Sequence, residues 1–254
     1  MWYLPLLRAN LIPDPLTRSG IRRLLRERLR QETALNRKDA FLAEMRKGPL
    51  AIHTREANEQ HYEVPTEFYL ESLGPRLKYS SCLWTNEVRD LAASELAMLD
   101  LTASRAAIQD GMDILELGCG WGSPTLYLAS RFPKSRITAV SNSRTQKAFI
   151  DRQAQLQGLG NVTIITSDMN DFAIDRSFDR VVSVEMFEHM RNYELLLEKV
   201  ARWLKPEGRL FVHIFVHDRL AYPFETDGDN DWMARYFFTG GLMPSFDIFH
   251  HFPK

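Results

Sequence analysis

The stretch from Met112 to Gly122, MDILELGCGWG, constrains the fold of this chain more than any other. Its apolar first half predicts a buried strand, and glycines then stand at every second position before a helical segment. A glycine has no Cβ, so its backbone can approach a ligand closely or adopt φ > 0. A strand, a glycine turn and a helix at the start of an α/β domain form a common cofactor-binding unit, although a tight structural turn uses the same glycines.

The glycine spacing narrows the ligand. The pattern is G-x-G-x-G rather than G-x-G-x-x-G, and no Gly-Lys-Ser/Thr follows that would hold a phosphate. A ligand with an adenosine but no pyrophosphate fits this pattern better, which points to S-adenosylmethionine. We therefore predict that Glu116, near the strand end, and the turn residues Gly118 and Gly120 bind this cofactor.

Composition and charge exclude several classes of protein. A chain of 254 residues buries a sizeable core and suits one domain with appendages. Its 32 Lys and Arg balance 33 Asp and Glu, so no nucleic-acid partner is predicted. Two cysteines exclude a disulfide framework and favour a reducing, cytoplasmic setting. No apolar run spans a bilayer, and the apolar start, with Pro5 and Arg8, lacks the basic region of a signal peptide.

Positive charge gathers near the N-terminus, where residues 1–47 hold eleven Lys or Arg against five Asp or Glu. Residues 1–17 contain three prolines and predict irregular structure. From Ser19 the apolar spacing predicts an amphipathic helix, and a second helix is expected over 38–47. The first helix is either a solvated helix lying on the domain or, through residues 19–47, a peripheral contact with an anionic membrane or a partner. The oligomeric state stays open.

From about residue 111 strand and helix patterns alternate. The predicted strands are Asp113–Leu117, Arg136–Val140, Val162–Thr166, Arg180–Val184 and Gly208–Phe215. The predicted helices between them are Ser123–Arg131, Arg144–Gln157 and Tyr193–Leu204. This alternation predicts an α/β fold, a parallel sheet with helices on both faces. Because right-handed crossovers bring the strand C-terminal ends to one edge, ligands are expected at that edge.

Polar residues follow the second and third strands. Ser141, Asn142 and Gln146 can hydrogen-bond a ribose, but the same segment can equally cap the next helix. Asp168 can accept a hydrogen bond from the adenine amino group while Met169 packs on the ring, and the alternative for Asp168 is a surface turn.

Two carboxylates and an imidazole follow the fourth strand within five residues: Glu185, Glu188 and His189. Charged groups gather at a ligand edge mostly when they have a function. Methyl transfer to an amine needs negative charge that positions the amine and a group that accepts its proton. The two glutamates suit the first task, and His189 titrates in the useful range for the second. A helix start with dipole-favoured acids explains one glutamate but not the whole set.

Five linked motifs carry a resemblance to a known family. They are the glycine turn, HYEVPTEFY (61–69), GPRLKYSSCLW (74–84), EMFEHMRNY (185–193) and RYFFTGGLMPS (235–245). In this order, from about residue 50 onward, they resemble the coclaurine N-methyltransferase branch of the cyclopropane-fatty-acid-synthase superfamily, which are class I S-adenosylmethionine-dependent methyltransferases. The resemblance implies a Rossmann-like core and methyl transfer to an amine nitrogen of a small molecule.

The resemblance also implies residue roles. Tyr79 and Ser80 reach over the methionine end of the cofactor, above Gly118 and Gly120. The segment with Ser141, Asn142 and Gln146 lines its ribose side, and Asp168 with Met169 lines its adenine side. The catalytic residues at the amine are Glu185, Glu188 and His189.

Two alternatives stay open. Cyclopropane synthesis transfers a methylene to unsaturated phospholipid chains, and those enzymes hold a bicarbonate base with residues that align with Cys82, Glu188 and His213. Position 185 discriminates, because cyclopropane synthases usually carry glycine there and an alkene has no use for the Glu185 carboxylate. The other alternative is a non-catalytic cofactor-binding or lipid-docking protein.

The last segment predicts a wall of the substrate pocket. Asp227, Asp229 and Asp231 precede four aromatic residues, Trp232, Tyr236, Phe237 and Phe238, and acidic with aromatic groups suit a cationic aromatic amine. The first three aromatic residues are the predicted substrate contacts. The alternative is a solvated acidic loop before a packed helix. His213 and His217 are candidate substrate contacts or, equally, core or rim histidines, and no ligand cluster predicts a metal site.

The predicted organisation has four parts. Residues 1–50 form a basic helical extension, and residues 51–110 form a helical cap with the HYEVP and KYSS motifs. Residues 111–217 form the cofactor-binding core, and residues 218–254 form the substrate lid. Since family members continue further, the resemblance predicts that C-terminal strands of the class I sheet are missing from this chain.

Overall fold

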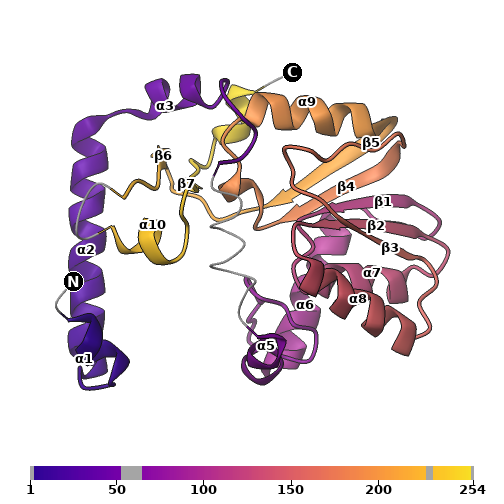
Figure 1. Cartoon of the computed structure of the whole chain (residues 1–254), viewed down its shortest axis with the longest axis horizontal. Coiled ribbons are helices and arrows are strands. Elements are labelled where there is room, and N and C mark those ends of the chain that lie inside the picture. The colour runs from indigo at the N-terminus through magenta and orange to yellow at the C-terminus, as the bar shows by residue number, and fades with distance from the viewer. Residues whose placement is uncertain (1–2, 53–64, 227–230, 253–254) are drawn as a thin grey trace.

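The computed structural model describes residues 3–52, 65–226 and 231–252. Its centre is a five-stranded parallel sheet of order β3-β2-β1-β4-β5 (Figure 1). The strands are β1 (Asp113–Leu117), β2 (Arg136–Ser141), β3 (Val162–Thr166), β4 (Phe178–Val184) and β5 (Leu204–His213). The strand order reverses between β1 and β4, and such a switch point is where open α/β sheets bind their ligands.

Helices cover both faces of the sheet, as the strand–helix alternation predicts. Side chains of a strand alternate between faces, so Ile114 packs in the core cluster of α6 (Leu91–Arg105) and α7 (Ser123–Arg131). Leu115 and Leu117 pack instead in the cluster that contains α9 (Tyr193–Trp203). The remaining crossover helix, α8 (Arg144–Leu156), lies against β3 on the α7 side.

The predicted element boundaries hold best where apolar runs are clean. The predicted span of β1, β3 and α7 agrees with the structure at both ends. For the fifth strand, predicted over 208–215, the structure has Leu204–His213, directly after α9. The early start was missed because Pro206 and Gly208 are unusual inside a strand. The strand ends two residues earlier than predicted because the Phe215 amide donates to the Glu188 carboxylate (3.2 Å).

The N-terminal extension consists of α1 (Leu4–Arg8), α2 (Asp14–Leu35) and α3 (Lys38–Glu44). The prediction of irregular structure over 1–17 was wrong for Leu4–Arg8 and from Asp14 onward, which are helical. Pro5 and Pro15 lie in the first turns of α1 and α2, where a proline removes no helical hydrogen bond. In the predicted cap, residues 65–110 contain α5 (Thr66–Ser72) and α6, whereas residues 61–64 of the HYEVP motif lie outside the described residues.

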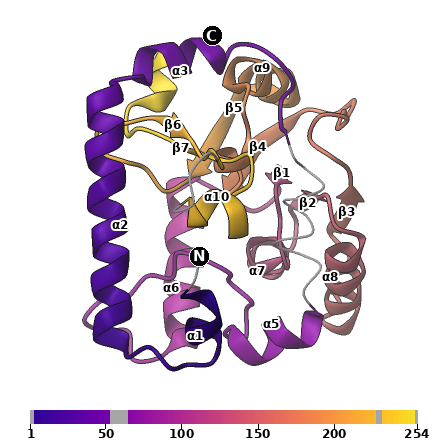
Figure 2. The ribbon, with the colours of Figure 1, turned by 60° about the vertical axis from the view of Figure 1, so that its left-hand side comes forward.

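Ion pairs join the extension to the C-terminal segment. This segment contains β6 (Tyr222–Pro223), α10 (Trp232–Tyr236), β7 (Leu242–Met243) and η2 (Ile248–His251). The β6–β7 pair and α10 lie between α2 and the sheet (Figures 1 and 2). Arg28 pairs with Asp231, and Arg37 bridges Glu225 (2.8 Å) and the buried Glu32 (2.9 Å). These basic side chains therefore hold the C-terminal segment against the extension.

The apolar stripe of α2 faces outward. Ile21, Leu25 and Leu29 are 51%, 63% and 46% exposed, so the described residues do not cover this stripe. Contact of the stripe with a membrane or a partner stays a prediction. Within the described parts of the chain, no helix has the length and apolar character needed to cross a bilayer.

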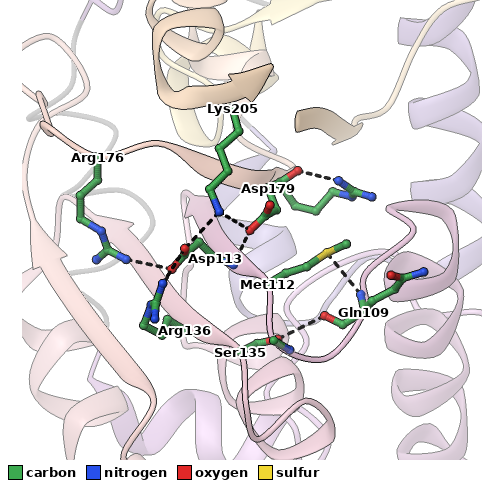
Figure 3. Close-up of polar contacts among 10 residues, drawn as sticks. Gln109, Met112, Asp113, Ser135, Arg136, Arg176, Asp179 and Lys205 are labelled. Atoms are coloured by element: carbon green, nitrogen blue, oxygen red, sulfur yellow. Dashed lines mark hydrogen bonds and ion pairs between the residues drawn. The ribbon is translucent and has the colours of Figure 1, made fainter. Parts of the chain in front are cut away.

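A cluster of opposite charges closes the N-terminal edge of the sheet (Figure 3). Asp113 accepts two hydrogen bonds from the Arg136 guanidinium (2.6 and 2.7 Å) and lies 3.1 Å from Arg176. Lys205 joins Asp113 (3.3 Å) to Asp179 (2.7 Å), and Asp179 also accepts the Asp113 amide (2.8 Å). The guanidinium of Arg136, followed by the ammonium of Lys205, keeps the pKa of Asp113 below its usual range.

We expect Asp113→Asn to lower the free energy of unfolding by about 1–2 kcal/mol at pH 7, since the partners are partly exposed. A carboxyl with a depressed folded-state pKa stabilises the fold above its unfolded-state pKa. That contribution is lost as pH falls through the folded-state value, so the difference from wild type should shrink below about pH 4. Urea unfolding at pH 7 and pH 3 measures it. The exposed Asp175→Asn is the control, and equal losses in both variants would contradict the prediction.

Candidate active site

The glycine turn at the end of β1 needs glycine for two different reasons. Gly118 has φ = +77°, and a Cβ there would lie 2.7 Å from the Met186 side chain. Gly120 has φ = +52°, and a Cβ there would meet no atom within 4 Å, so the space above it is open. The amides of Gly118 and Cys119 both donate to the Val140 carbonyl (3.0 Å each) and so fix the turn to β2. An open space above bare backbone is where a ligand can approach most closely.

Two cavities meet above this turn. Cavity A lies toward β2 and β3, and its lining includes Gly118, Gly120, Ser141, Asn142, Gln146, Asp168, Met169, Met186, His189 and Thr239. Cavity B lies toward the loop 77–80 and the start of α7, and its lining includes Lys78, Tyr79, Ser80, Glu116, Gly118, Gly120, Gln146 and Glu185. Both cavities share Gly118, Gly120 and Gln146. One elongated ligand crossing the turn would therefore occupy both.

All the predicted cofactor residues line one of the two cavities. Ser143 caps α8 through the Gln146 amide (3.2 Å), while Ser141 donates to Gln146 Oε1 (2.6 Å). The Gln146 Nε2 is buried and has no partner among the described residues, although buried donors are nearly always bonded. A donor in this state is available to a ligand acceptor.

Asp168 lies in a turn and also lines a cavity, so its position agrees with both alternatives that the sequence left open. Its Oδ1 accepts the Asn170 amide (2.8 Å) in a turn, and the residue also lines cavity A. Met169 next to it is nearly buried and lines the same wall.

Glu116 forms the floor of cavity B. Its side chain is 1% exposed and accepts a hydrogen bond from Thr125 Oγ1 (2.6 Å). Burial raises the pKa of Glu116 to about 7, against the lowering effects of Thr125 and Lys78. The charge of this carboxyl therefore depends on what occupies the cavity.

The carboxylate pair lies where β4 ends. Ser81 Oγ donates to Glu185 Oε1 (3.2 Å), and Glu188 Oε1 accepts the Phe215 amide (3.2 Å). Glu188 is fully buried, and its Oε2 has no hydrogen-bond partner among the described residues. Burial, followed by the charge of Glu185, raises the pKa of Glu188 to about 8, and burial also raises the pKa of Glu185. Near neutral pH the pair thus holds a proton.

His189 lines cavity A, whereas Glu185 lines cavity B and Glu188 lines neither. Its ring stacks on Phe238 at 4.7 Å between centroids, with 23° between the planes. Phe238 is also packed edge-on against Phe215 (5.4 Å), so several aromatic groups fix the imidazole plane. Phe238, two residues after α10, therefore contacts the predicted catalytic histidine.

The predicted substrate-binding aromatics lie elsewhere. Trp232 and Tyr236 pack on one another at 5.7 Å and are 40% and 42% exposed, and Phe237 packs edge-on against Phe238 (4.9 Å). None of the three lines cavity A or B. Asp231, one of the acidic residues expected at a cationic substrate, pairs with Arg28.

The other three predicted substrate residues also lie outside the linings of both cavities. Cys82 is half-buried. His213 accepts the Glu185 amide at its carbonyl (2.8 Å), and burial, with Lys78 nearby, lowers the pKa of its imidazole. His217 uses Nδ1 to accept two backbone amides of its own turn, those of Arg219 (3.1 Å) and Leu220 (3.0 Å).

Comparison with known proteins agrees with this geometry. Residues 51–252 match the family model described as mycolic acid cyclopropane synthetase. The chain is 40% identical over 210 residues to (S)-coclaurine N-methyltransferase of Thalictrum flavum subsp. glaucum, covering 82% of this chain and 58% of that protein. The Papaver somniferum enzyme of the same name is 35% identical over 240 residues, 92% of this chain and 68% of the relative.

A crystal structure of coclaurine N-methyltransferase bound to N-methylheliamine and SAH has a TM-score of 0.92 at 35% identity, over 98% of this chain and 74% of that one. The chain belongs to the mycolic acid cyclopropane synthetase family. The predicted resemblance and the class I methyltransferase fold are confirmed. The chain spans 58% of the length of the Thalictrum relative.

Within this member of the mycolic acid cyclopropane synthetase family, the site stores backbone strain. Glu185 has φ = +53° and Ser81, its hydrogen-bond donor, has φ = +57°. Such conformations cost of the order of 1–3 kcal/mol for a residue with a Cβ and persist where the surroundings enforce them. The bond from the Glu185 amide to the His213 carbonyl (2.8 Å) is one enforcing contact.

We expect Glu185→Gly to be more stable than Glu185→Ala by about 1 kcal/mol, because both lose the carboxylate but glycine alone relaxes at positive φ. Urea unfolding of both variants measures the difference. The matched control is Glu198→Gly against Glu198→Ala on the exposed side of α9, where the usual order, alanine above glycine, is expected. An alanine variant at 185 as stable as the glycine variant would show that this backbone is unstrained.

The raised pKa of Glu188 predicts a pH-dependent stability. The folded state keeps a proton that the unfolded chain releases near pH 4.5, so this stabilisation is complete below that pH and is lost as pH rises through about 8. We expect Glu188→Gln, which cannot ionise, to gain up to about 3 kcal/mol on wild type between pH 5.5 and 8.5. Thermal unfolding across this range measures the gain, and parallel curves for the two proteins would refute the assignment.

Proposed function

We propose that this protein is an S-adenosylmethionine-dependent methyltransferase that acts on an amine nitrogen of a small molecule. The observation that carries the proposal is the group of ionisable side chains after β4: Glu185 lines cavity B, His189 lines cavity A, and Glu188 is buried behind them, outside both linings, with a raised pKa. The names of the relatives support the same chemistry, since both are N-methyltransferases.

The residues of both cavities fit the cofactor. The open space above Gly120 admits a ligand against the backbone, and the Gln146 Nε2 donor lacks a protein partner among the described residues. Tyr79, Ser80 and Glu116 would hold the amino-acid end in cavity B. The adenosine would lie in cavity A, against Ser141, Asn142, Asp168 and Met169. When bound, the cofactor supplies a methyl group activated by the sulfonium sulfur.

The carboxylate pair binds and orients the amine. A cationic ammonium beside Glu185, which lines cavity B, favours the ionised form of that carboxyl and lowers the pKa that burial has raised. The pair then holds the nitrogen by charge, with Ser81 fixing one oxygen of Glu185. The nitrogen becomes nucleophilic only after it loses its proton, and His189, stacked on Phe238, is the group positioned to accept it.

The test is a mass-spectrometric screen with methyl-labelled cofactor over a panel of amines and unsaturated phospholipids. A methyl gained on nitrogen is expected. Glu185→Gly and His189→Ala should lower methyl transfer by about 100-fold or more, with the affinity for S-adenosylhomocysteine within about twofold of wild type. His250→Ala, at an exposed position, is the control.

Two results would overturn the proposed reaction, and a third would overturn the assignment of its residues. A methylene gained on an acyl chain would assign cyclopropane synthesis. Cofactor binding without turnover on any amine or lipid would assign a non-catalytic binding protein. Normal methylation by both site variants would leave the reaction in place but remove these residues from it.

A further inference from the structure

Lys78 is a buried cation in cavity B. The residue is 6% exposed and lines the cavity together with Tyr79, Ser80 and Glu116. Its ammonium forms no ion pair or hydrogen bond with any described residue, and among the described residues that line cavity B it is the single basic side chain. The ammonium is not among the fully enclosed polar atoms without a partner, so it stays accessible, and a ligand anion in cavity B can contact it.

The nearby carboxylates do not provide such a contact. Burial lowers the pKa of Lys78 and outweighs the groups that act on it through space, which are the Cys82 thiol and the carboxyls of Glu185, Glu116 and Glu95. Each of these carboxyls is bonded to another donor: Glu116 to Thr125, Glu185 to Ser81, and Glu95 to the backbone. The ammonium is therefore surrounded by negative potential and still lacks a contacting oxygen among the described residues.

The backbone around Lys78 is held in place before any ligand arrives. Buried Glu95 of α6 accepts the amides of Arg76 and Lys78 (3.0 Å each). A Cβ on Gly74 would lie 2.5 Å from the Glu95 carboxyl carbon, so the loop closes tightly on this side chain. Leu77 has φ = +48°, a conformation that persists only under such constraint. A residue fixed in this way acts as a preorganised contact.

We propose that Lys78 binds the carboxylate of the cofactor's amino-acid end, while Glu116 faces its ammonium. The inference rests on the proposed function, which assigns cavity B to that end. A zwitterion needs one cation and one anion on the walls around it, and Lys78 and Glu116 supply this pair. Lys78 is thus a binding residue that distinguishes amino-acid-bearing adenosyl compounds from those without a carboxylate.

Isothermal titration calorimetry on the full chain tests the proposal with two probes. The first is S-adenosylhomocysteine, and the second is its decarboxylated analogue, which keeps the adenosine, the thioether and the amine. Wild type should bind the first at least tenfold more tightly. Lys78→Met should lose at least tenfold affinity for S-adenosylhomocysteine and bind the analogue as wild type does, because only the first probe carries the group that Lys78 contacts.

The controls separate this role from a structural one. Lys134→Met removes an exposed lysine and should change neither affinity. Lys78→Arg keeps the charge and should retain part of the discrimination. Lys78→Met should keep or raise the melting temperature, since it removes a buried charge without a contact partner, and Lys78→Gln serves as a second neutral variant for the same titrations.

The outcomes are distinguishable. If Lys78→Met and Lys78→Gln bind both probes as wild type does, Lys78 does not contact the carboxylate, and the methyltransferase proposal still stands. If the discrimination is kept but the pH profile of turnover shifts, Lys78 acts on Glu185 instead, and the inference is overturned. If wild type binds neither probe, the cofactor assignment itself fails.

Discussion

The removal of carboxyl groups from water at the ends of β1 and β4 is the constraint on which the candidate site depends. Glu116 and Glu188 are almost completely buried, and Glu185 is partly buried beside them. An ionised carboxylate in such surroundings costs several kcal/mol unless it is paired. Burial therefore raises the pKa of Glu116 to about 7 and, together with the charge of Glu185, that of Glu188 to about 8. Whether these carboxyls are charged therefore depends on a cationic ligand, as the proposed binding of an amine and a sulfonium requires.

The two edges of the same sheet use charge in opposite ways. At the N-terminal edge, Asp113 is contacted by Arg136, Arg176 and Lys205, and its pKa is lowered (Figure 3). At the C-terminal edge, Glu188 keeps an oxygen without a partner among the described residues, and the pKa is raised. Paired charge near solvent stabilises the fold modestly, whereas unpaired buried charge destabilises it and is available for binding.

The sequence predicted the sheet well because the apolar strands and the crossover helices each have one clear period. It also predicted which strand ends lie beside the two cavities, since parallel strands bring their C-terminal ends to one edge of the sheet. What it could not predict depends on packing between distant segments. Phe238, rather than Tyr236, reaches His189 because α10 ends at Tyr236 and the chain then turns inward. Lys78 belongs to the GPRLKYSSCLW motif (74–84), but the sequence does not show that the carboxyls near its ammonium are bonded to other donors, Glu95 to the backbone and Glu116 to Thr125.

Glu185 links the stability of the fold to its choice of chemistry. Its φ of +53° is a conformation that glycine adopts without strain, so the fold by itself favours glycine at this position. Glycine is also the residue that the resemblance associates with transfer to an alkene, where no charge is needed. A glutamate that accepts the strain adds a carboxylate 3.2 Å from Ser81 and close enough to Glu188 to raise its pKa. Glycine and glutamate therefore differ at this position in strain and in charge, while the backbone conformation that the fold requires of them is the same.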